Sequence, residues 1–295
     1  MKLIRPIEIT QALVTANSAT NVDADYVPAT SYALNALVTY DRRIYKSLQA
    51  ANVGNTPGIT ASAAWWSDQG PSNKWAVFDS EVNTKTTATS PWSFTLTGVS
   101  VDSLSLIGMS ASTVDIVVTK DAATVYSKTV SLLDTSLVTN WGEYFFNEPE
   151  FKSDLALVDL PAIPGAVVTV TLTRTGGGSV SCGKFDCGKV LNVGLEIYGL
   201  KRSGEDYTSV TFDQFRTATI GTQRYVRKFS TTAIIENTRF DLIARRLDAL
   251  ASVPLVIIGG DGHYDSLIVY GLLSYSIDLS LYQYSHVSFD VKGLI

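Results

Sequence analysis

The chain has 295 residues, of which 45% are hydrophobic and only 17% are charged, and its formal net charge is −5. This balance argues against a nucleic-acid-binding protein, because no basic stripe is present to release the counterions of a phosphate backbone. No apolar run approaches the roughly 18 residues that a membrane-spanning helix needs. Serine, threonine, valine and tyrosine are plentiful, which favours strands over helices, so we expect a mainly β protein.

Residues 1–25 are expected to form an extended N-terminal arm that contains one short strand. Charged residues and Pro6 interrupt its apolar stretch, so we expect no secretory signal peptide. We predict that this arm and a C-terminal docking domain, residues 201–295, make protein–protein contacts while the middle of the chain faces outward. Deletion of residues 1–10 would then weaken assembly with partners.

Residues 26–79 are expected to form a small aromatic-rich β module, in which three of the five tryptophans lie close together on either side of a Gly-Pro link. Successive side chains on a strand point to opposite faces, so one of Trp65 and Trp66 should be core and the other accessible. Trp75 is expected to pack with Phe78 against the next unit. The alternative is that the whole cluster is core, which so small a module needs.

Residues 80–200 are expected to form a β-sandwich or jelly-roll domain, because strands with period-2 alternation recur at short spacing between turn residues. The expected strands are residues 93–99, 102–109, 113–120, 124–132, 167–174 and 191–199. Residues 121–123 are expected to form a hairpin turn between two of them. The glycine-rich residues 176–179 predict a turn and not a phosphate-binding loop, since no Lys-Ser/Thr pair follows.

Residues 201–295 are expected to form an α+β unit with one helix inside residues 237–252. In that segment Phe240, Ile243, Leu247 and Leu250 lie on one helical face. The pair Thr238 and Asp241 resembles a helix start, and Pro254 ends the helix. Residues 266–280 and 286–294 are expected to be the closing strands.

The two cysteines, Cys182 and Cys187, are expected to be free thiols, with a disulfide as the alternative. A zinc site would want four ligands, and the only histidines are His263 and His286. We therefore expect no metal and no cofactor.

The segment Gly259 to Asp265 is the most site-like polar cluster. On a strand, Asp261, His263 and Asp265 would share one face and could serve a metal or an acid–base site. We favour a glycine-rich turn that carries turn-forming residues. No hydrolase or metalloprotease motif is present, so we expect no enzyme and predict that His263→Ala leaves function near normal.

The aromatic module resembles the small chitin-binding type of carbohydrate-binding module. The family's motif positions correspond here to Tyr32, Val38, Tyr45-Lys46, Asn52, Gly54, Pro57 and Trp65. The family's Gly-Asp pair is replaced by Asn35-Ala36. The resemblance implies a glycan-binding platform, for which we predict Tyr40, Tyr45, Trp65 and Trp66, because aromatic rings offer flat partners to the C–H faces of sugars.

A second resemblance covers most of the chain. The run of residues 70–86, the pair Tyr270-Gly271 and the closing pair Gly293-Leu294 resemble segments of tailed-phage virion proteins. This implies a structural component of a tail or baseplate, located in the virion and assembled in the host cytoplasm. Its partners would be other tail or baseplate proteins, and the chain would form a homo-oligomer or dock on a ring. Host surface glycans would be a further ligand.

Two other functions stay open. The chain could be a non-catalytic carbohydrate-binding module of a secreted or cell-wall glycan-degrading system. It could also be a glycosidase, although that chemistry needs two positioned carboxylates, and no such pair is identifiable in the sequence. Experiment can distinguish these three functions. A tail or baseplate subunit would be present in particles at fixed copy number, a carbohydrate-binding module would bind polysaccharide as a monomer, and a glycosidase would turn over its substrate.

Overall fold

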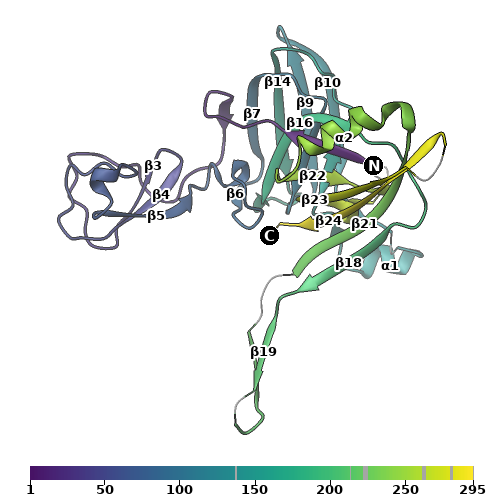
Figure 1. The fold of residues 1–295 in the computed structure, drawn as a ribbon. Helices are drawn as coiled ribbons and strands as arrows, with labels where there is room; N and C mark the ends of the chain where they lie inside the picture. Colours follow the sequence, from purple (N-terminus) through teal and green to yellow (C-terminus); the bar gives the residue numbers. More distant parts are fainter. Residues whose placement is uncertain (137, 213, 222–224, 261–263, 280–281, 295) are drawn as a thin grey trace.

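The computed structural model describes residues 1–136, 138–212, 214–221, 225–260, 264–279 and 282–294. The described chain is mainly β, as its composition predicts. Figure 1 shows a small module set to one side, a two-layer body with a strongly curled sheet, and a hairpin that projects from the body.

The larger sheet is antiparallel throughout and combines strands from the start, the middle and the end of the chain. In spatial order it contains β13 (Leu155–Leu157), β8 (Ser103–Ile107), β16 (Lys184–Asn192), β1 (Lys2–Pro6), β22 (Leu255–Ile258), β23 (Ile268–Asp278), β24 (Tyr284–Gly293), β21 (Tyr225–Glu236) and β17 (Leu195–Glu196), and β18 (Lys201–Asp206) also pairs with β21. The expected boundary at residue 200 therefore falls within one continuous sheet.

The first residues of the chain are not the arm that the sequence predicts. β1 lies between β16 and β22 and pairs with both, and the side chains of Met1, Leu3 and Ile4 are fully buried. The approach of β1 to β16 is so close that a Cβ at Gly188 would lie 1.8 Å from the carbonyl oxygen of Arg5. A strand with both edges paired is part of the folding unit and cannot serve as a docking arm.

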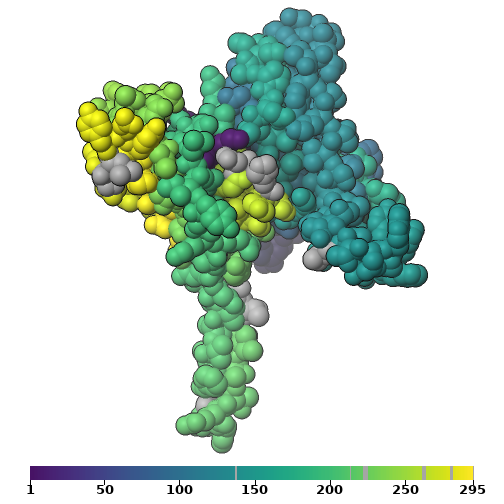
Figure 2. All heavy atoms as spheres, turned by 90° about the vertical axis from the view of Figure 1, so that its right-hand side faces the viewer, coloured from purple at the N-terminus to yellow at the C-terminus, as the bar shows by residue number. Residues whose placement is uncertain are grey.

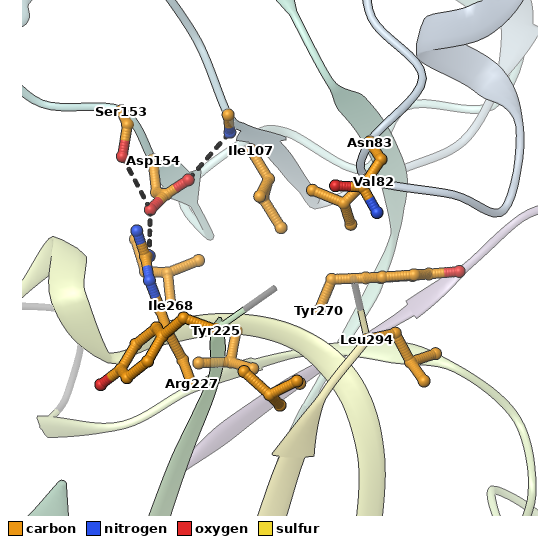
Figure 3. A pocket seen from close by; sticks show the side chains of 14 residues that line it. Val82, Asn83, Ile107, Ser153, Asp154, Tyr225, Arg227, Ile268, Tyr270 and Leu294 are labelled. Carbon is orange, nitrogen blue, oxygen red and sulfur yellow. Dashed lines mark hydrogen bonds and ion pairs between the residues drawn. The ribbon is translucent and has the colours of Figure 1, made fainter. Parts of the chain in front are cut away.

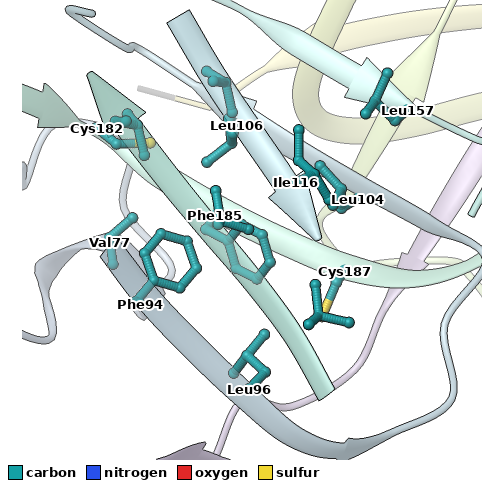
Figure 4. Close-up of a cluster of buried hydrophobic side chains, with 14 of the residues drawn as sticks. Val77, Phe94, Leu96, Leu104, Leu106, Ile116, Leu157, Cys182, Phe185 and Cys187 are labelled. Carbon is teal, nitrogen blue, oxygen red and sulfur yellow. The ribbon is translucent and has the colours of Figure 1, made fainter. Parts of the chain in front are cut away.

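The smaller sheet has the order β10 (Ala123–Ser131), β9 (Thr113–Lys120), β14 (Ala166–Thr173), β7 (Trp92–Val99) and β2 (Val14–Asn17). Its alternating apolar side chains pack on β8 and β16 to form the sandwich core. Figure 4 shows Phe94 and Ile116 of the smaller sheet beside Leu104 and Phe185 of the larger one, all fully buried. The expected sandwich strands are present, except that residues 191–199 are split between the end of β16 and β17.

The C-terminal helix is where its apolar pattern predicts. η3 (Asn237–Arg239) leads into α2 (Phe240–Asp248), and Ile243, Leu247 and Leu250 are buried against the larger sheet. The hydroxyl of Thr238 does not cap this helix but contacts the carboxylate of Glu236.

The remaining elements are short. They are β3 (Leu37–Tyr40), β4 (Arg43–Ser47) and β5 (Trp66–Pro71) of the module, the pairs β6 (Thr86–Thr89) with β15 (Ser179–Cys182), β11 (Leu133–Asp134) with β12 (Glu150–Phe151) and β19 (Ser209–Phe212) with β20 (Ala218–Gly221), the turns η1 (Thr60–Ser62), η2 (Ala76–Phe78) and η5 (Asp265–Leu267), and α1 (Trp141–Phe146). Two of them, β15 and η2, contribute buried side chains such as Cys182 and Val77 to the sandwich core.

Truncation of β1 side chains should destabilise the whole body. Leu3→Ala is expected to lower the free energy of unfolding by about 2–5 kcal/mol, because it leaves a cavity in a close-packed core. Arg5→Ala, on the same strand but exposed, should change it by less than about 0.5 kcal/mol. Urea unfolding of both variants checks this, and equal effects would contradict the central position of β1.

Candidate binding surfaces

The aromatic module has its own small core. Val38, Tyr45 and Trp66 are buried, and Tyr26, Tyr32 and Trp65 pack against them. The indole Nε1 of Trp66 donates a hydrogen bond to the carbonyl oxygen of Asn55 at 2.7 Å. Its ring meets that of Tyr32 edge-on, with 5.4 Å between centroids. Trp66 is therefore a structural residue of the module.

Asparagines fix the turns of this module. Asn52 is fully buried, and its side-chain amide donates to the hydroxyl of Ser47 at 3.0 Å while its backbone pairs with Tyr32. Asn35 stands where the resembled family has glycine, and its φ of 67° lies in the left-handed region. Asparagine adopts that region more readily than most residues, so this turn forms without a glycine.

The structure separates the four predicted glycan-contacting residues. Tyr45 and Trp66 are buried, at 8% and 5% exposure, whereas Trp65 is half-buried and Tyr40 is 37% exposed. Tyr40 contacts the ring of Tyr26 edge-on at 5.6 Å. Only Tyr40 and Trp65 of the four retain accessible area for a ligand.

Trp75 joins the module to the body, as the sequence predicts. Its ring packs edge-on against Phe78 at 5.4 Å, and Phe78 in turn meets Phe94 and Phe185 of the sandwich core at 5.4 and 6.2 Å. The guanidinium of Arg42, from the module, lies 5.4 Å from the centre of the Trp75 ring. This side chain is therefore a structural contact between two units.

A buried charge pair lies on the face of the larger sheet opposite the sandwich core. The Lys184 ammonium is 3.1 Å from the Asp186 carboxylate, donates to the carbonyl oxygen of Asp79 at 2.5 Å, and lies 4.9 Å from the centre of the Tyr270 ring. Burial raises the pKa of Asp186, and the Lys184 charge opposes that rise. The second carboxylate oxygen of Asp186 and the hydroxyl of Ser105 have no partner within the described chain.

Tyr270, which the Lys184 ammonium contacts, also lines a pocket of about 170 Å³ (Figure 3). Its wall includes Asp154, whose carboxylate accepts hydrogen bonds from the amide of Gly108 at 2.9 Å and the hydroxyl of Ser153 at 3.0 Å and pairs with Arg227. Asp154 is the only acidic residue among the described residues that line the pocket. This wall therefore lacks the facing carboxylates that glycoside hydrolysis uses.

The other polar candidates are the segment that ends at Asp265 and the two cysteines. Asp261 and His263 lie outside the described residues, and Asp265 begins η5 rather than a strand. Cys182 and Cys187 are free, buried thiols, and burial raises the pKa of each to about 12. Within the described ranges, no group of three or more His, Cys, Asp or Glu side chains is arranged to hold a metal ion.

α1, which was not predicted from the sequence, is a short helix whose aromatic side chains face away from every core. Trp141, Phe145 and Phe146 are 77%, 68% and 89% exposed. The side-chain oxygen of Asn140 accepts from the amide of Glu143 at 2.9 Å, and the Glu143 carboxylate accepts from the amide of Thr139 at 2.7 Å. This capping pattern, Asn followed three residues later by Glu, was the available signal.

The β19–β20 hairpin is a second projecting apolar element. Phe212, Phe215 and Ile220 are 68%, 80% and 63% exposed. β18, which leads into the hairpin, pairs with β21 along its whole length, and Lys228 and Lys292 both contact the Glu205 carboxylate at its end. The hydrogen bond from Lys228 lowers the pKa of Glu205 to about 2. The sheet thus holds the base of the hairpin.

Comparison of the chain with family models, with curated proteins and with solved structures found no match. The resemblances to carbohydrate-binding modules and to virion proteins therefore stay predictions. None of the helices in the described part of the chain has the length and apolar character needed to cross a lipid bilayer.

Removal of the Lys184 charge should reveal the free-energy penalty of burying the Asp186 carboxylate. Lys184→Met is expected to destabilise the fold by about 3–5 kcal/mol at pH 7, because it leaves a buried carboxylate without its cation. The pKa of Asp186 is higher in the folded state than its value of about 3.9 in the unfolded state. The carboxyl group therefore contributes most to stability at a pH below the unfolded-state pKa, and this contribution is lost as pH rises through the folded-state pKa. The loss should therefore be smaller at pH 4 than at pH 7.

The matched control is Lys184→Met combined with Asp186→Leu, which removes both charges and should recover most of the lost stability. Denaturant titrations at the two pH values measure these differences. A loss of the same size at pH 4 and pH 7 would show that the pair carries no charge penalty.

Proposed function

We propose that this chain is a non-enzymatic structural subunit of a tailed-phage tail or baseplate. The supporting observation is the exposure of α1 and of the β19–β20 hairpin, two elements that carry large apolar side chains outside any core. Contiguous exposed apolar surface on a folded protein marks an interaction site. An assembly buries such surface, whereas a freely diffusing monomer would leave it in contact with water.

The position of these elements fits a subunit role. Figure 2 shows the hairpin extending far from the compact body. A projecting hairpin reaches neighbours that the body itself does not touch, and its base is fixed to the larger sheet. The partners would be other tail or baseplate proteins, in a virion assembled in the host cytoplasm, with the chain as a homo-oligomer or docked on a ring.

Quantitative mass spectrometry of purified particles from the phage that encodes the chain tests this role. The chain should be present at a fixed ratio to the other virion proteins through successive purification steps. A ratio that falls toward zero as the particles are purified would contradict the proposal.

A second candidate function is glycan binding by the aromatic module. The observation that favours it is that Tyr40 and Trp65 keep accessible area on a unit set to one side of the body. Aromatic faces stack on the C–H face of a sugar ring at small entropic cost. Host surface glycans would be the ligand in the virion setting, and polysaccharide would be the ligand of a cell-wall-degrading system.

Two aromatic substitutions separate binding from folding in this module. Tyr40→Ala should weaken retention on immobilised chitin or host cell-wall glycan at least tenfold and leave the melting temperature nearly unchanged. Trp66→Ala should destabilise the module by about 3–5 kcal/mol, because it empties the core. If Tyr40→Ala and Trp65→Ala both bind as well as the unmodified chain, the module is only a spacer.

A further inference from the structure

We propose that the β19–β20 hairpin of one copy docks on the α1 surface of a second copy, in a head-to-tail contact. The α1 surface is the exposed face of α1 together with the adjoining β11–β12 pair. This inference rests on the proposed structural role and names a partner for two elements whose large apolar side chains are exposed in the single chain.

The hairpin has one apolar face and one polar face. Its register places Val210 opposite Ile220 and Phe212 opposite Ala218. Side chains two residues apart on a strand share a face, so these four form one apolar face. The neighbouring positions Ser209, Thr211 and Thr219 form the other. An isolated two-stranded hairpin is marginally stable unless such a face is covered.

The α1 surface contains a hollow of about 650 Å³ that is lined by both aromatic and acidic side chains. Tyr144, Phe145 and Phe146 provide the aromatic part, at 55%, 68% and 89% exposure. The carboxylates around it belong to Asp134, Glu143, Glu148 and Glu150. The aromatic part of this lining suits apolar side chains, and its carboxylates suit a positive charge.

The charge of the hairpin turn is complementary to those carboxylates. Arg216 lies at the turn, beside Phe215, and is exposed, with a φ of 60°. A hairpin that inserts Phe215 into the hollow would bring this guanidinium close to the carboxylates that line it. Complementary charge at the edge of an apolar contact fixes orientation more than it adds affinity.

The areas also match what a specific contact needs. At about 200 Å² for each aromatic side chain, Phe212 and Phe215 offer roughly 300 Å² and the four aromatic residues of α1, which are 55% to 89% exposed, roughly 600 Å². With Val210 and Ile220 the total is about 1,000 Å², which is near the lower bound for a specific interface.

A second copy is favoured because one repeated contact covers both surfaces. Pairing of two hairpins with each other would leave α1 exposed on both chains. Within one chain the hairpin stands clear of the body (Figures 1 and 2). A head-to-tail contact generates a closed ring or a filament, which are the forms that heterologous interfaces build.

Cross-linking between single-cysteine variants of the full chain tests this contact. Thr217→Cys at the hairpin turn and Asn147→Cys at the end of α1 both replace exposed residues, and the native thiols are buried. The two variants, one carrying an affinity tag, are mixed at high micromolar concentration with a short bis-maleimide. We expect covalent dimers between the two variants and few dimers within either variant alone.

Two outcomes would overturn the inference. Thr217→Cys chains that cross-link to each other as efficiently as the mixture would show hairpin-to-hairpin pairing. Absence of any dimer would show that the second copy is not the occupant.

The two faces of the hairpin supply a matched mutational control. Phe212→Ser with Ile220→Ser should weaken self-association in sedimentation velocity by about tenfold or more, as expected for the loss of buried anchors. Thr211→Ser with Thr219→Ser, on the polar face, should leave it unchanged. Equal effects of the two pairs would contradict docking through the apolar face.

The result of these experiments does not depend on whether the chain is found in particles. A chain present in particles at fixed ratio but without the cross-link would keep the structural role and exclude this contact. A cross-linked chain absent from particles would keep the contact and exclude the tail or baseplate role.

Discussion

The pairing of β1 on both of its edges is the constraint on which the rest of the structure depends. β1 lies between β16 and β22 in the larger sheet. β16 belongs to the part of this sheet that packs in the sandwich core, and β22 belongs to the part that α2 covers. The successive side chains of β1 face opposite ways, so Leu3 enters one core and Ile4 another. Without this strand two sheet edges would carry unpaired amide and carbonyl groups, which are costly when buried.

Because β1 is paired on both edges, the larger sheet is continuous, and the body fixes the positions of the peripheral elements. The larger sheet holds β18 through its pairing with β21, and Trp75 and Phe78 join the aromatic module to the sandwich core. Several of the most exposed large apolar side chains, among them Phe146 and Phe215, lie on α1 and the hairpin. A partner that covers those elements would meet them at fixed places on the body and would order the hairpin, which is marginally stable while its apolar face is uncovered.

Local patterns predicted the elements whose signal lies within one segment. Period-2 alternation located β7, β9 and β14, and the spacing of Ile243, Leu247 and Leu250 located α2. The place of β1 could not be predicted, because a strand's neighbours are set by pairing with residues about 190 and 250 positions away. α1 was missed because its aromatic residues face no core. Adjacency of Trp65 and Trp66 predicted a difference in burial but not which one is core, which depends on contacts such as that with Tyr32.

Hydrogen–deuterium exchange, compared between the isolated chain at low concentration and the chain in assembled particles, tests the central claim most directly. Amides of β1 should be protected in both samples, because their hydrogen bonds belong to the fold. Amides of β19, β20 and α1 should exchange fast in the isolated chain and become protected in particles. Equal exchange of the hairpin and α1 in the two samples would contradict the account that these elements are assembly surfaces.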